Sequence, residues 1–145
     1  MLQAAQLAER IIVCHREPGY LRLQLPAQLP SLHGDRELLF EALANLLSNS
    51  IKFTPPGGEV ILRAANEDGS PLIEVLDTGP GIPEAERVAV FQRFYRCDDK
   101  HGGFGLGLSI ARGIVEAHGG TLWLNSAPGC GASFCFSLPK PKAMV

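Results

Sequence analysis

The stretch NLLSNSIK, residues 45–52, lies inside a segment whose apolar residues otherwise recur with helical spacing. A helix turns about 100° per residue, so Glu41, Asn45, Asn49 and Lys52 fall on one narrow polar stripe. The remaining positions suit a protein core; they are Leu38, Leu39, Ala42, Leu43, Leu46, Leu47 and Ile51. Asparagine is a poor helix former because its side chain competes for backbone hydrogen bonds. Two asparagines one turn apart therefore indicate that the stripe has a function.

The chain has the size and composition of a single soluble domain. Its 145 residues are enough to bury a core without disulfides or metals, and 46% of them are hydrophobic and 19% charged. Thirteen basic and fifteen acidic residues give a net charge of −2, and no run of lysine or arginine predicts a nucleic-acid-binding surface. No apolar run reaches the length of a membrane span, and the N-terminus lacks a signal-peptide pattern. We therefore expect a domain that contacts neither nucleic acid nor a membrane.

The four cysteines form neither a metal-binding nor a disulfide pattern. Cys14, Cys97, Cys130 and Cys135 include no C-x-x-C pair and show no ligand-like spacing with the four histidines. This pattern predicts reduced thiols in a reducing compartment and argues against a zinc site.

The first third of the chain predicts a helix, a strand and a second helix. Residues 1–13 have the composition of a helix, and residues 20–25 alternate apolar and polar side chains as a strand does. Gly34-Asp35 offers an N-cap to the helix that carries the polar stripe, and Thr54-Pro-Pro-Gly-Gly58 ends that helix. Residues 1–19 are therefore expected to form a leading helical segment, the end of a linker helix.

The rest of the chain predicts two strands, a loop, helical segments and two more strands. The expected elements are a hairpin of residues 59–65 and 72–76, a loop at 77–83, a short helical piece at 84–94, a helix at 105–118 closed by Gly119-Gly120, and strands at 121–125 and 132–138. The inner stripe of the later helix is expected at Leu106, Ile110, Ile114 and Ala117. This order predicts an α+β fold, a two-layer α/β sandwich whose mixed, mostly antiparallel sheet is covered on one face by helices. Residues 140–145 are expected to be a tail.

Three glycines, Gly103, Gly105 and Gly107, precede and open the later helix. Glycines let backbone N–H groups approach an anion, and the first turn of a helix presents unpaired donors, so a phosphate would fit there. A flexible connection explains such a segment equally well. The spacing does not match the dinucleotide-binding fingerprint or the phosphate-binding loop, and the protein-kinase motifs are absent.

A second glycine loop follows an apolar strand at Asp77-Thr-Gly-Pro-Gly81. The carboxylate of Asp77 is a suitable acceptor for an exocyclic amine such as that of adenine, and the glycines would admit the flat ring. The competing interpretation is an aspartate-initiated turn, which is the more common meaning of such a motif in isolation.

Four motifs in a fixed order carry a resemblance to a known family. NLLSNSIKF, LDTGPGIP, FQRFYR and GGFGLGLSIA, followed by EAHGGTLWLNSAPGCGASFCFSLP, together resemble the ATP-binding catalytic domain of sensor histidine kinases. The similarity runs from about Asp35 to Pro139, within an expected catalytic domain of residues 20–139. It implies the Bergerat fold, which DNA gyrase, MutL and the ninety-kilodalton heat-shock chaperone share, with ATP held between the helices and a lid loop.

The resemblance implies a role for each matching residue. Asn49 would bind Mg²⁺ through its amide oxygen, a type of ligand that this ion prefers. Asn45 would support the phosphates or a metal-bound water, Lys52 would pair with phosphate oxygens, and Arg96 would steady the γ-phosphate. Asp77 would accept a hydrogen bond from the adenine amino group. The other residues that the resemblance places around the nucleotide are Gly79, Gly81, Ile82, Phe94, Tyr95, Gly103, Gly105, Leu106, Gly107 and Ser133.

The resemblance also bears on catalysis and on partners. ATP-hydrolysing members carry a glutamate at the position of Asn45, so we expect slow ATP hydrolysis by this domain alone. No acceptor-histidine motif is present, and His118 occupies a helix-ending position, so the acceptor is expected on a separate, histidine-bearing dimerisation domain. A response regulator receiver domain would be a further partner. The location would be cytoplasmic, whether or not the parent protein is anchored in the inner membrane, and the isolated domain would be monomeric.

Two departures from the family pattern concern the lid and the last strand. Phe104 stands where a small threonine is usual, and Ala132 replaces a common hydroxyl residue, with Ser133 beside it. Two alternative functions remain open. One is a serine kinase of the anti-sigma-factor type on the same fold, and the other is a non-catalytic module that docks a partner when ATP is bound.

Overall fold

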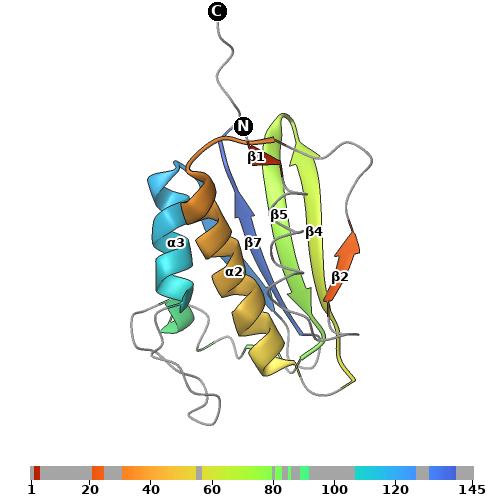
Figure 1. Ribbon diagram of the computed structural model, residues 1–145. Helices are drawn as coiled ribbons and strands as arrows, with labels where there is room; N and C mark the ends of the chain where they lie inside the picture. Colours follow the sequence, from red (N-terminus) through yellow and green to blue (C-terminus); the bar gives the residue numbers. More distant parts are fainter. Residues whose placement is uncertain are drawn as a thin grey trace, which may run out of the picture.

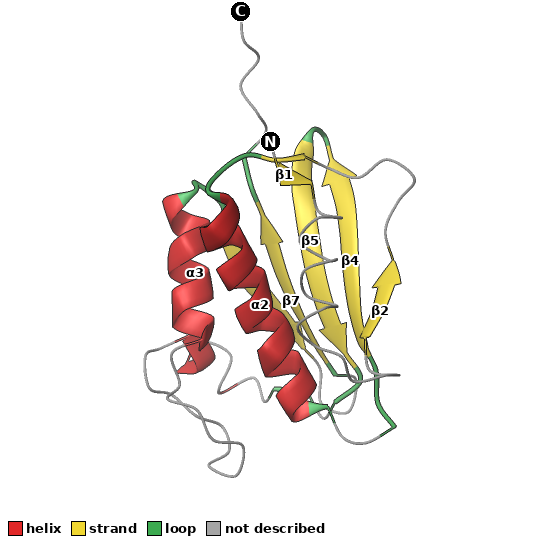
Figure 2. Cartoon of the chain, viewed as in Figure 1, coloured by secondary structure: helices red, strands yellow, loops and turns green. Residues whose placement is uncertain are grey.

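Helices cover one face of a five-stranded sheet, and the two layers enclose the core (Figure 1). This computed structural model describes residues 2–3, 21–24, 31–54, 57–79, 81–82, 85, 89–91, 107–126 and 131–139. Figure 2 shows the two helices, α2 and α3, side by side on the same face of the strands. The expected α+β class is confirmed.

The sheet is mixed, and its strands follow the order β2-β4-β5-β7-β6. They are β2 (Leu21–Gln24), β4 (Val60–Glu67), β5 (Ser70–Asp77), β6 (Thr121–Ser126) and β7 (Ala132–Ser137). β2 runs parallel to β4, whereas the other neighbouring strands are antiparallel. The parallel pair is possible because a helix, α2, lies in the connection between β2 and β4.

A second, two-stranded sheet joins β1 (Leu2–Gln3) to β3 (Ser31–Leu32) in antiparallel register. The prediction of a helix over residues 1–13 is therefore wrong at its start. Leu2 and Gln3 pair with a neighbouring strand because a tertiary partner can outweigh the helix propensity of good helix formers such as leucine and glutamine. Residues 4–13 of that segment and the tail at 140–145 lie outside the described part of the chain.

β4 and β5 form the predicted hairpin with longer strands than the sequence indicated. The register pairs Glu67 with Ser70, so only Asp68 and Gly69 remain in the turn. Both have positive φ, 53° and 87°, as in the type I′ turn that matches the twist of two-residue hairpins.

α2 (Arg36–Phe53) begins and ends where the sequence predicted. Asp35 is its N-cap, and the Oδ1 atom accepts a hydrogen bond of 3.0 Å from the Leu38 N–H. At the other end, the Thr54 hydroxyl donates to the Ser50 carbonyl oxygen at 2.7 Å. The buried residues of the helix are the expected Leu39, Ala42, Leu43, Leu46 and Leu47, with Ile51 partly buried beside them. Leu38, in the first turn of the helix, was expected in the core but is 41% exposed.

α3 (Gly107–Ala117) buries Ile114, as predicted, but its other buried residues differ from the predicted stripe. Ala111, Ile114 and Val115 are its buried residues, whereas Ile110 is 38% exposed and Ala117 is exposed. The buried face of α3 is therefore turned by about one residue position from the face that the sequence predicted. The small Ala111 is fully buried, so a larger side chain there would have to displace its neighbours in the core. Leu106 lies outside the described residues.

The C-terminus of α3 is fastened to the N-terminus of α2. Gly119, at φ 79°, and Gly120 donate to the Glu116 and Val115 carbonyl oxygens, the pattern of a Schellman motif. His118 Nε2 accepts a hydrogen bond of 3.0 Å from the Asp35 N–H, and its Nδ1 lies 2.8 Å from the Ile114 carbonyl oxygen. These contacts require a proton on Nδ1 and give His118 the structural role that its helix-ending position predicted.

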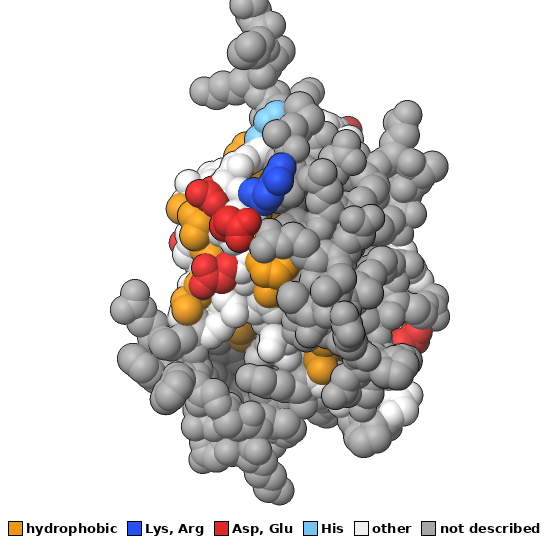
Figure 3. Space-filling model, in the orientation of Figure 1, with side chains coloured by type: hydrophobic (Ala, Val, Ile, Leu, Met, Phe, Trp, Pro, Cys, Tyr) orange, Lys and Arg blue, Asp and Glu red, His pale blue; other side chains and the backbone are white. Residues whose placement is uncertain are grey.

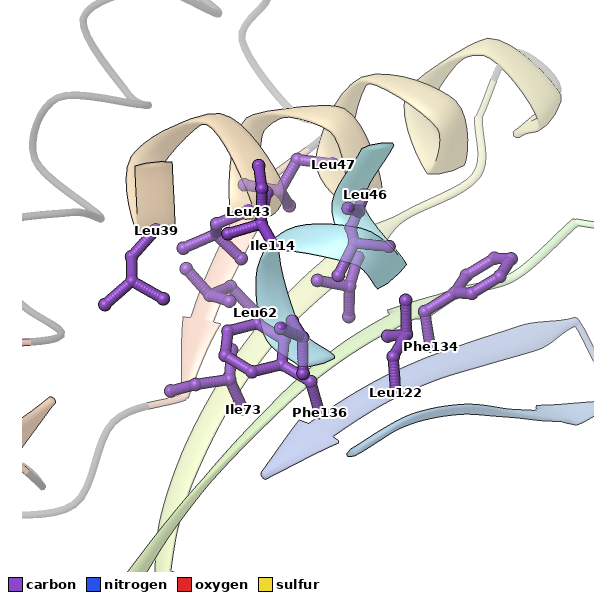
Figure 4. Packing of buried hydrophobic residues seen from close by; sticks show 14 of the residues in the cluster. Leu39, Leu43, Leu46, Leu47, Leu62, Ile73, Ile114, Leu122, Phe134 and Phe136 are labelled. Carbon is purple, nitrogen blue, oxygen red and sulfur yellow. The ribbon is translucent and has the colours of Figure 1, made fainter. Parts of the chain in front are cut away.

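The core lies between the helices and the sheet (Figure 4). Its largest fully buried side chains are Leu39, Leu43, Leu46, Leu47, Val60, Ile73, Val75, Phe134 and Phe136. The expected helical piece over residues 84–94 is described at Ala89–Phe91 as a single 3₁₀ turn, η2. Phe91 packs edge-on against Phe134, with ring centroids 6.1 Å apart, and the Arg112 guanidinium lies over the Phe91 ring.

Figure 3 shows acidic and apolar side chains gathered over the two helices. The exposed residues of α2 and α3 include Glu37, Glu41 and Glu116, and the exposed large hydrophobic residues are Leu38 and Ile110. Among the described residues, no helix combines the length and the hydropathy needed to span a bilayer.

Candidate functional site

Asn45 and Asn49 lie one turn apart on α2, outside the fully buried side of the helix. Both residues are half-buried, whereas Glu41, one turn earlier, is exposed. Lys52 belongs to the same helix, but its side chain lies outside the described part of the structure. The half-buried part of the predicted polar stripe therefore consists of the two amides of Asn45 and Asn49.

Asn45 faces the first turn of α3. A Cβ added to Gly107 would lie 3.8 Å from Asn45 Oδ1, so the start of α3 is close to this amide. The Asn45 Nδ2 atom is buried and has no hydrogen-bond partner within the described structure. An unpaired buried donor costs about 1–3 kcal/mol, so this atom is better explained by a ligand than by the stability of the ligand-free fold.

Asp77 ends β5, and its side chain organises the loop that follows. Its Oδ1 atom accepts hydrogen bonds from the Gly79 N–H at 3.0 Å and from the Ala132 N–H at 3.2 Å. The bond to Gly79 forms an aspartate-initiated turn. For Oδ1, the interpretation of the motif as a turn is therefore correct. The bond to Ala132 adds a tie to β7 that the sequence did not predict.

Burial raises the pKa of the Asp77 carboxyl above its ordinary value of 3.8. The hydrogen bonds from Gly79 and Ala132, together with the nearby Ser50 side chain, act in the opposite direction but do not cancel the effect of burial. A desolvated carboxylate of this kind is suited to accept a hydrogen bond from a bound molecule.

The backbone around Asp77 is fixed from two sides. Thr78 donates its N–H to the Glu59 carbonyl oxygen at 3.1 Å, and its Oγ1 accepts from the Glu59 N–H at 2.9 Å. Gly131 has a φ of 78°, and a Cβ placed there would overlap the Asp77 carbonyl oxygen. Gly81, also predicted for the site, has a φ of 81°, and Ile82 packs against the core beside it. The loop thus holds the carboxylate in a defined position.

Ser50 is a residue near this site that sequence reasoning missed. It is 1% exposed, and its side chain faces the Asp77 carboxyl, where it acts to lower that pKa against the effect of burial. A signal for it existed, because Ser50 lies three and four residues after Leu47 and Leu46, on the buried side of α2. A serine among leucines on that side is as unusual as the two asparagines beside it.

Ser133 does not join the cluster around Asp77. Its hydroxyl donates to Glu74 Oε1 at 2.7 Å, on the face of the sheet opposite the helices. Successive residues of a strand point to opposite faces, so the buried Ala132 and Phe134 place Ser133 on the other side. Ser133 therefore does not supply the hydroxyl that Ala132 lacks, and its side chain points away from Asp77.

Several predicted site residues lie outside the described part of the structure. These are Phe94, Tyr95, Arg96, Gly103, Gly105 and Leu106, together with Phe104. Of the predicted lid, only Gly107 is described, where it opens α3 beside Asn45.

The described side chains suit a hydrated metal ion better than a dedicated metal cage. Within the described residues, no group of three or more His, Cys, Asp or Glu side chains surrounds a common point. Mg²⁺ commonly keeps several waters and takes its other ligands from one or two protein oxygens and from phosphates. The amide oxygen of Asn49 is a ligand of that kind.

Comparisons with known proteins agree with this geometry. Residues 34–142 match the family described as histidine kinase-, DNA gyrase B- and HSP90-like ATPase. The adaptive-response sensory kinase SasA of Microcystis aeruginosa (strain NIES-843 / IAM M-2473) is 41% identical over 118 residues, which are 79% of this chain and 31% of the relative. The chain thus spans about a third of the length of that curated relative.

Two solved structures share the fold over nearly the whole chain. Full-length ShkA in complex with AMPPNP has a TM-score of 0.81 and 33% identity, and the match covers 97% of this chain and 30% of ShkA. The histidine kinase ThkA in complex with the response regulator protein TrrA has a TM-score of 0.80 and 25% identity, with 97% of this chain and 41% of the ThkA chain covered.

Proposed function

Since the chain belongs to the family of histidine kinase-, DNA gyrase B- and HSP90-like ATPases, we propose that it is the ATP-binding catalytic domain of a two-component sensor histidine kinase. In this role it donates the γ-phosphoryl group of ATP to a histidine on a separate domain. The observation that carries the proposal is Asn45 Nδ2, which is buried beside Gly107 and has no hydrogen-bond partner among the described residues. At the end of β5, the desolvated Asp77 carboxylate supplies an acceptor for a second, amino-bearing end of the same ligand.

The polyphosphate end is assigned to α2 and to the lid. Asn49 would hold Mg²⁺ through its amide oxygen, and the Asn45 Nδ2 atom would donate to a phosphate oxygen or to a water of the ion. When bound, Mg²⁺ neutralises part of the negative charge of the phosphates. Lys52 and Arg96 would add positive charge, and the backbone of Gly103, Gly105 and Gly107 would wrap the phosphates.

The purine end is assigned to the loop after β5. Asp77 would accept from the exocyclic amino group of adenine, with Gly79 and Gly81 leaving room for the ring. Ile82, Phe94, Tyr95 and Leu106 would supply apolar contacts to the nucleotide.

Transfer, rather than hydrolysis, is the reaction that this residue set favours. Phosphoryl transfer depends mainly on positioning and on charge stabilisation. The position of Asn45 carries no proton acceptor, and Glu41, one turn away, is exposed. A water molecule is therefore not activated for attack, and the domain alone turns over ATP slowly.

The partners follow from the proposed reaction. The acceptor histidine would lie on a dimerisation domain, and a response regulator receiver domain would take the phosphoryl group from that histidine. ThkA has been solved with the response regulator protein TrrA, which supports a partner of this class. The reaction places the domain in the cytoplasm, and the isolated domain is expected to be monomeric.

The test is a transfer assay with γ-labelled ATP, Mg²⁺ and the histidine-bearing domain of the parent protein. We expect a phosphorylated acceptor whose label is lost in acid and survives in base, as a phosphohistidine does. A label that survives acid would instead favour the serine kinase of the anti-sigma-factor type. Binding of ATP without any transfer would favour the docking module.

A further inference from the structure

We infer that the free edge of β6 (Thr121–Ser126), on the side away from β7, is an interaction surface that binds an extended segment of a partner protein as an additional strand. The segment pairs with β6 through backbone hydrogen bonds, and it alternates large apolar side chains with small ones. This inference goes beyond the proposed function, because the edge of β6 lies outside the set of residues assigned to ATP.

The first support is the state of the β6 backbone. β6 is the last strand in the order β2-β4-β5-β7-β6, and within the described part of the chain it pairs with β7 alone. The described backbone hydrogen bonds of turns and loops do not involve residues 121–126. In an antiparallel pair, every second residue directs its N–H and C=O away from the partner strand. These groups recur about every 7 Å along β6, and another extended backbone carries donors and acceptors at the same spacing.

The second support is that β6 carries none of the usual protections of a sheet edge. Natural sheets commonly block a free edge with lysine, proline, a bulge or a very short strand. The sequence of β6, TLWLNS, contains no charged residue and no proline, and its register with β7 is one-to-one over all 6 residues. At the opposite edge, β2 has only 4 residues and includes Arg22, and its Gln24 side chain accepts a hydrogen bond from Arg63. Of these two edges, that of β6 is therefore suited to pairing.

The third support is the side-chain chemistry that fits beside β6, which β7 already shows. On the helix side, Leu122 and Leu124 lie opposite Phe136 and Phe134, and on the other side Trp123 lies opposite Cys135. Trp123 and Leu124 are only half-buried, so β6 keeps accessible apolar surface on both faces of the sheet. A strand on the free edge meets the same two faces, and cross-strand neighbours contribute to the pairing. The partner segment therefore repeats the alternation of β7.

The size of the edge favours a transient partner over a second copy of the chain. The 6 residues of β6 span about 20 Å. A stable dimer buries about 1,200–2,000 Å², and a single pair of strands is only marginally stable. Pairing at β6 is therefore suited to an extended segment that binds and leaves, and not to a permanent contact between two folded domains.

The experiment uses a synthetic peptide with the sequence of residues 131–138, which include β7. Serine replaces Cys135, the ends are blocked, and one added lysine and one added glutamate keep the net charge at zero. We expect the peptide to slow amide hydrogen exchange by at least about tenfold at alternate residues of β6, those whose N–H faces away from β7. The residues of β2 should not change. No protection of β6 at roughly 1 mM peptide, or equal protection of β2, would overturn the inference.

Asn125→Lys tests the edge by adding a charge at an exposed position of β6, and Asn66→Lys is the matched control. Asn66 is also exposed, and it lies on the inner strand β4. Asn125→Lys should weaken peptide binding by at least about tenfold, whereas Asn66→Lys should leave it unchanged, and both should keep the melting temperature of the wild type. Equal effects of the two variants would contradict a site at β6. Dimerisation that Asn125→Lys abolishes would overturn the assignment of a separate partner, because a second copy would then occupy the edge.

Discussion

Asn45 and Asp77 both bury polar groups at a cost to the ligand-free protein. Asn45 Nδ2 is buried without a hydrogen-bond partner among the described residues, and Asp77 is a carboxylate whose pKa is raised by burial. Each arrangement is unfavourable for folding alone, and each is relieved by a ligand with complementary groups. This pattern distinguishes a binding site from ordinary helix packing.

The pH dependence of stability should report the state of Asp77. Its pKa is raised in the folded protein above 3.8, so the folded state holds this proton more tightly than the unfolded state. The resulting stabilisation is complete below the unfolded pKa and is lost as the pH rises through the folded pKa. Relative to Asp77→Asn, the wild type should therefore lose unfolding free energy over that range, as measured by urea denaturation from pH 3.5 upward.

Asp77→Asn should also weaken ATP binding by roughly 10- to 100-fold, since the charge-assisted hydrogen bond between the Asp77 carboxylate and the adenine amino group is lost. If the unfolding free energies of the wild type and of Asp77→Asn change with pH in the same way, burial does not raise the pKa of Asp77. Unchanged ATP affinity would remove it from the purine site.

Asn45→Glu should convert slow ATP turnover into faster hydrolysis. The change places a proton acceptor where Asn45 now lies, and a positioned general base contributes typically about 10²- to 10⁴-fold to a rate. We expect an increase in phosphate release of at least about tenfold at saturating ATP. Asn45→Gln, which restores the length without the carboxylate, is the control. An increase with both variants would exclude the general-base explanation.

At the scale of elements, local sequence signals located α2, α3 and the strands of the five-stranded sheet, but not always the face that each presents. The boundaries of α2 follow from Asp35 and from the proline-glycine segment after Thr54. In α3, Ile110 with Ile114 and Ala111 with Val115 are both pairs at a spacing of four, so the sequence offers two stripes. Contact with α2 and the sheet selects one of them, and that information is not local.

Strand alternation in the sequence already indicates on which face of the sheet Ser133 lies. Phe134 and Phe136 are buried on the helix side, so Ser133 must lie on the other face. The resemblance suggested a hydroxyl near the nucleotide, and the alternation of the same strand already argued against this particular one.

Gly131 tests how the connections between elements position the site. Gly131→Ala adds a Cβ against the Asp77 carbonyl oxygen at a φ of 78°. We expect it to lower the free energy of unfolding by about 1–3 kcal/mol and to weaken ATP binding, because Asp77 must move. Gly113→Ala is the control, since a Cβ there meets nothing within 4 Å on an exposed part of α3. It should stabilise by about 0.5–1 kcal/mol. If Gly131→Ala and Gly113→Ala lowered the free energy of unfolding equally, the proposed contact between position 131 and the Asp77 carbonyl oxygen would be contradicted.

At the scale of the whole molecule, the order of the motifs predicted the fold better than any single element did. The amides of α2, the Asp77 loop and the start of α3 are distant in the sequence, and the structure brings their described parts to one side of the sheet layer. Antiparallel α2 and α3 explain this, because Gly107 lies near Asn45 while His118 bonds to Asp35. The pairing of β1 with β3 was beyond prediction, since it depends on a partner nearly thirty positions away.

A site assembled from such distant segments should couple nucleotide binding to global stability. A ligand that binds only the folded state stabilises it by about 2.7 kcal/mol at one hundred times its dissociation constant. For a domain of this length we therefore expect Mg-ATP to raise the melting temperature by roughly 5–10 °C in calorimetry. Removal of Mg²⁺ with EDTA should abolish most of the shift. In Asn49→Ala, the shift with ATP alone and the shift with Mg-ATP should be equal in size. A full shift in EDTA would mean that the amide stripe binds the phosphates without a metal, and Asn49 would then have to act as a direct donor to them.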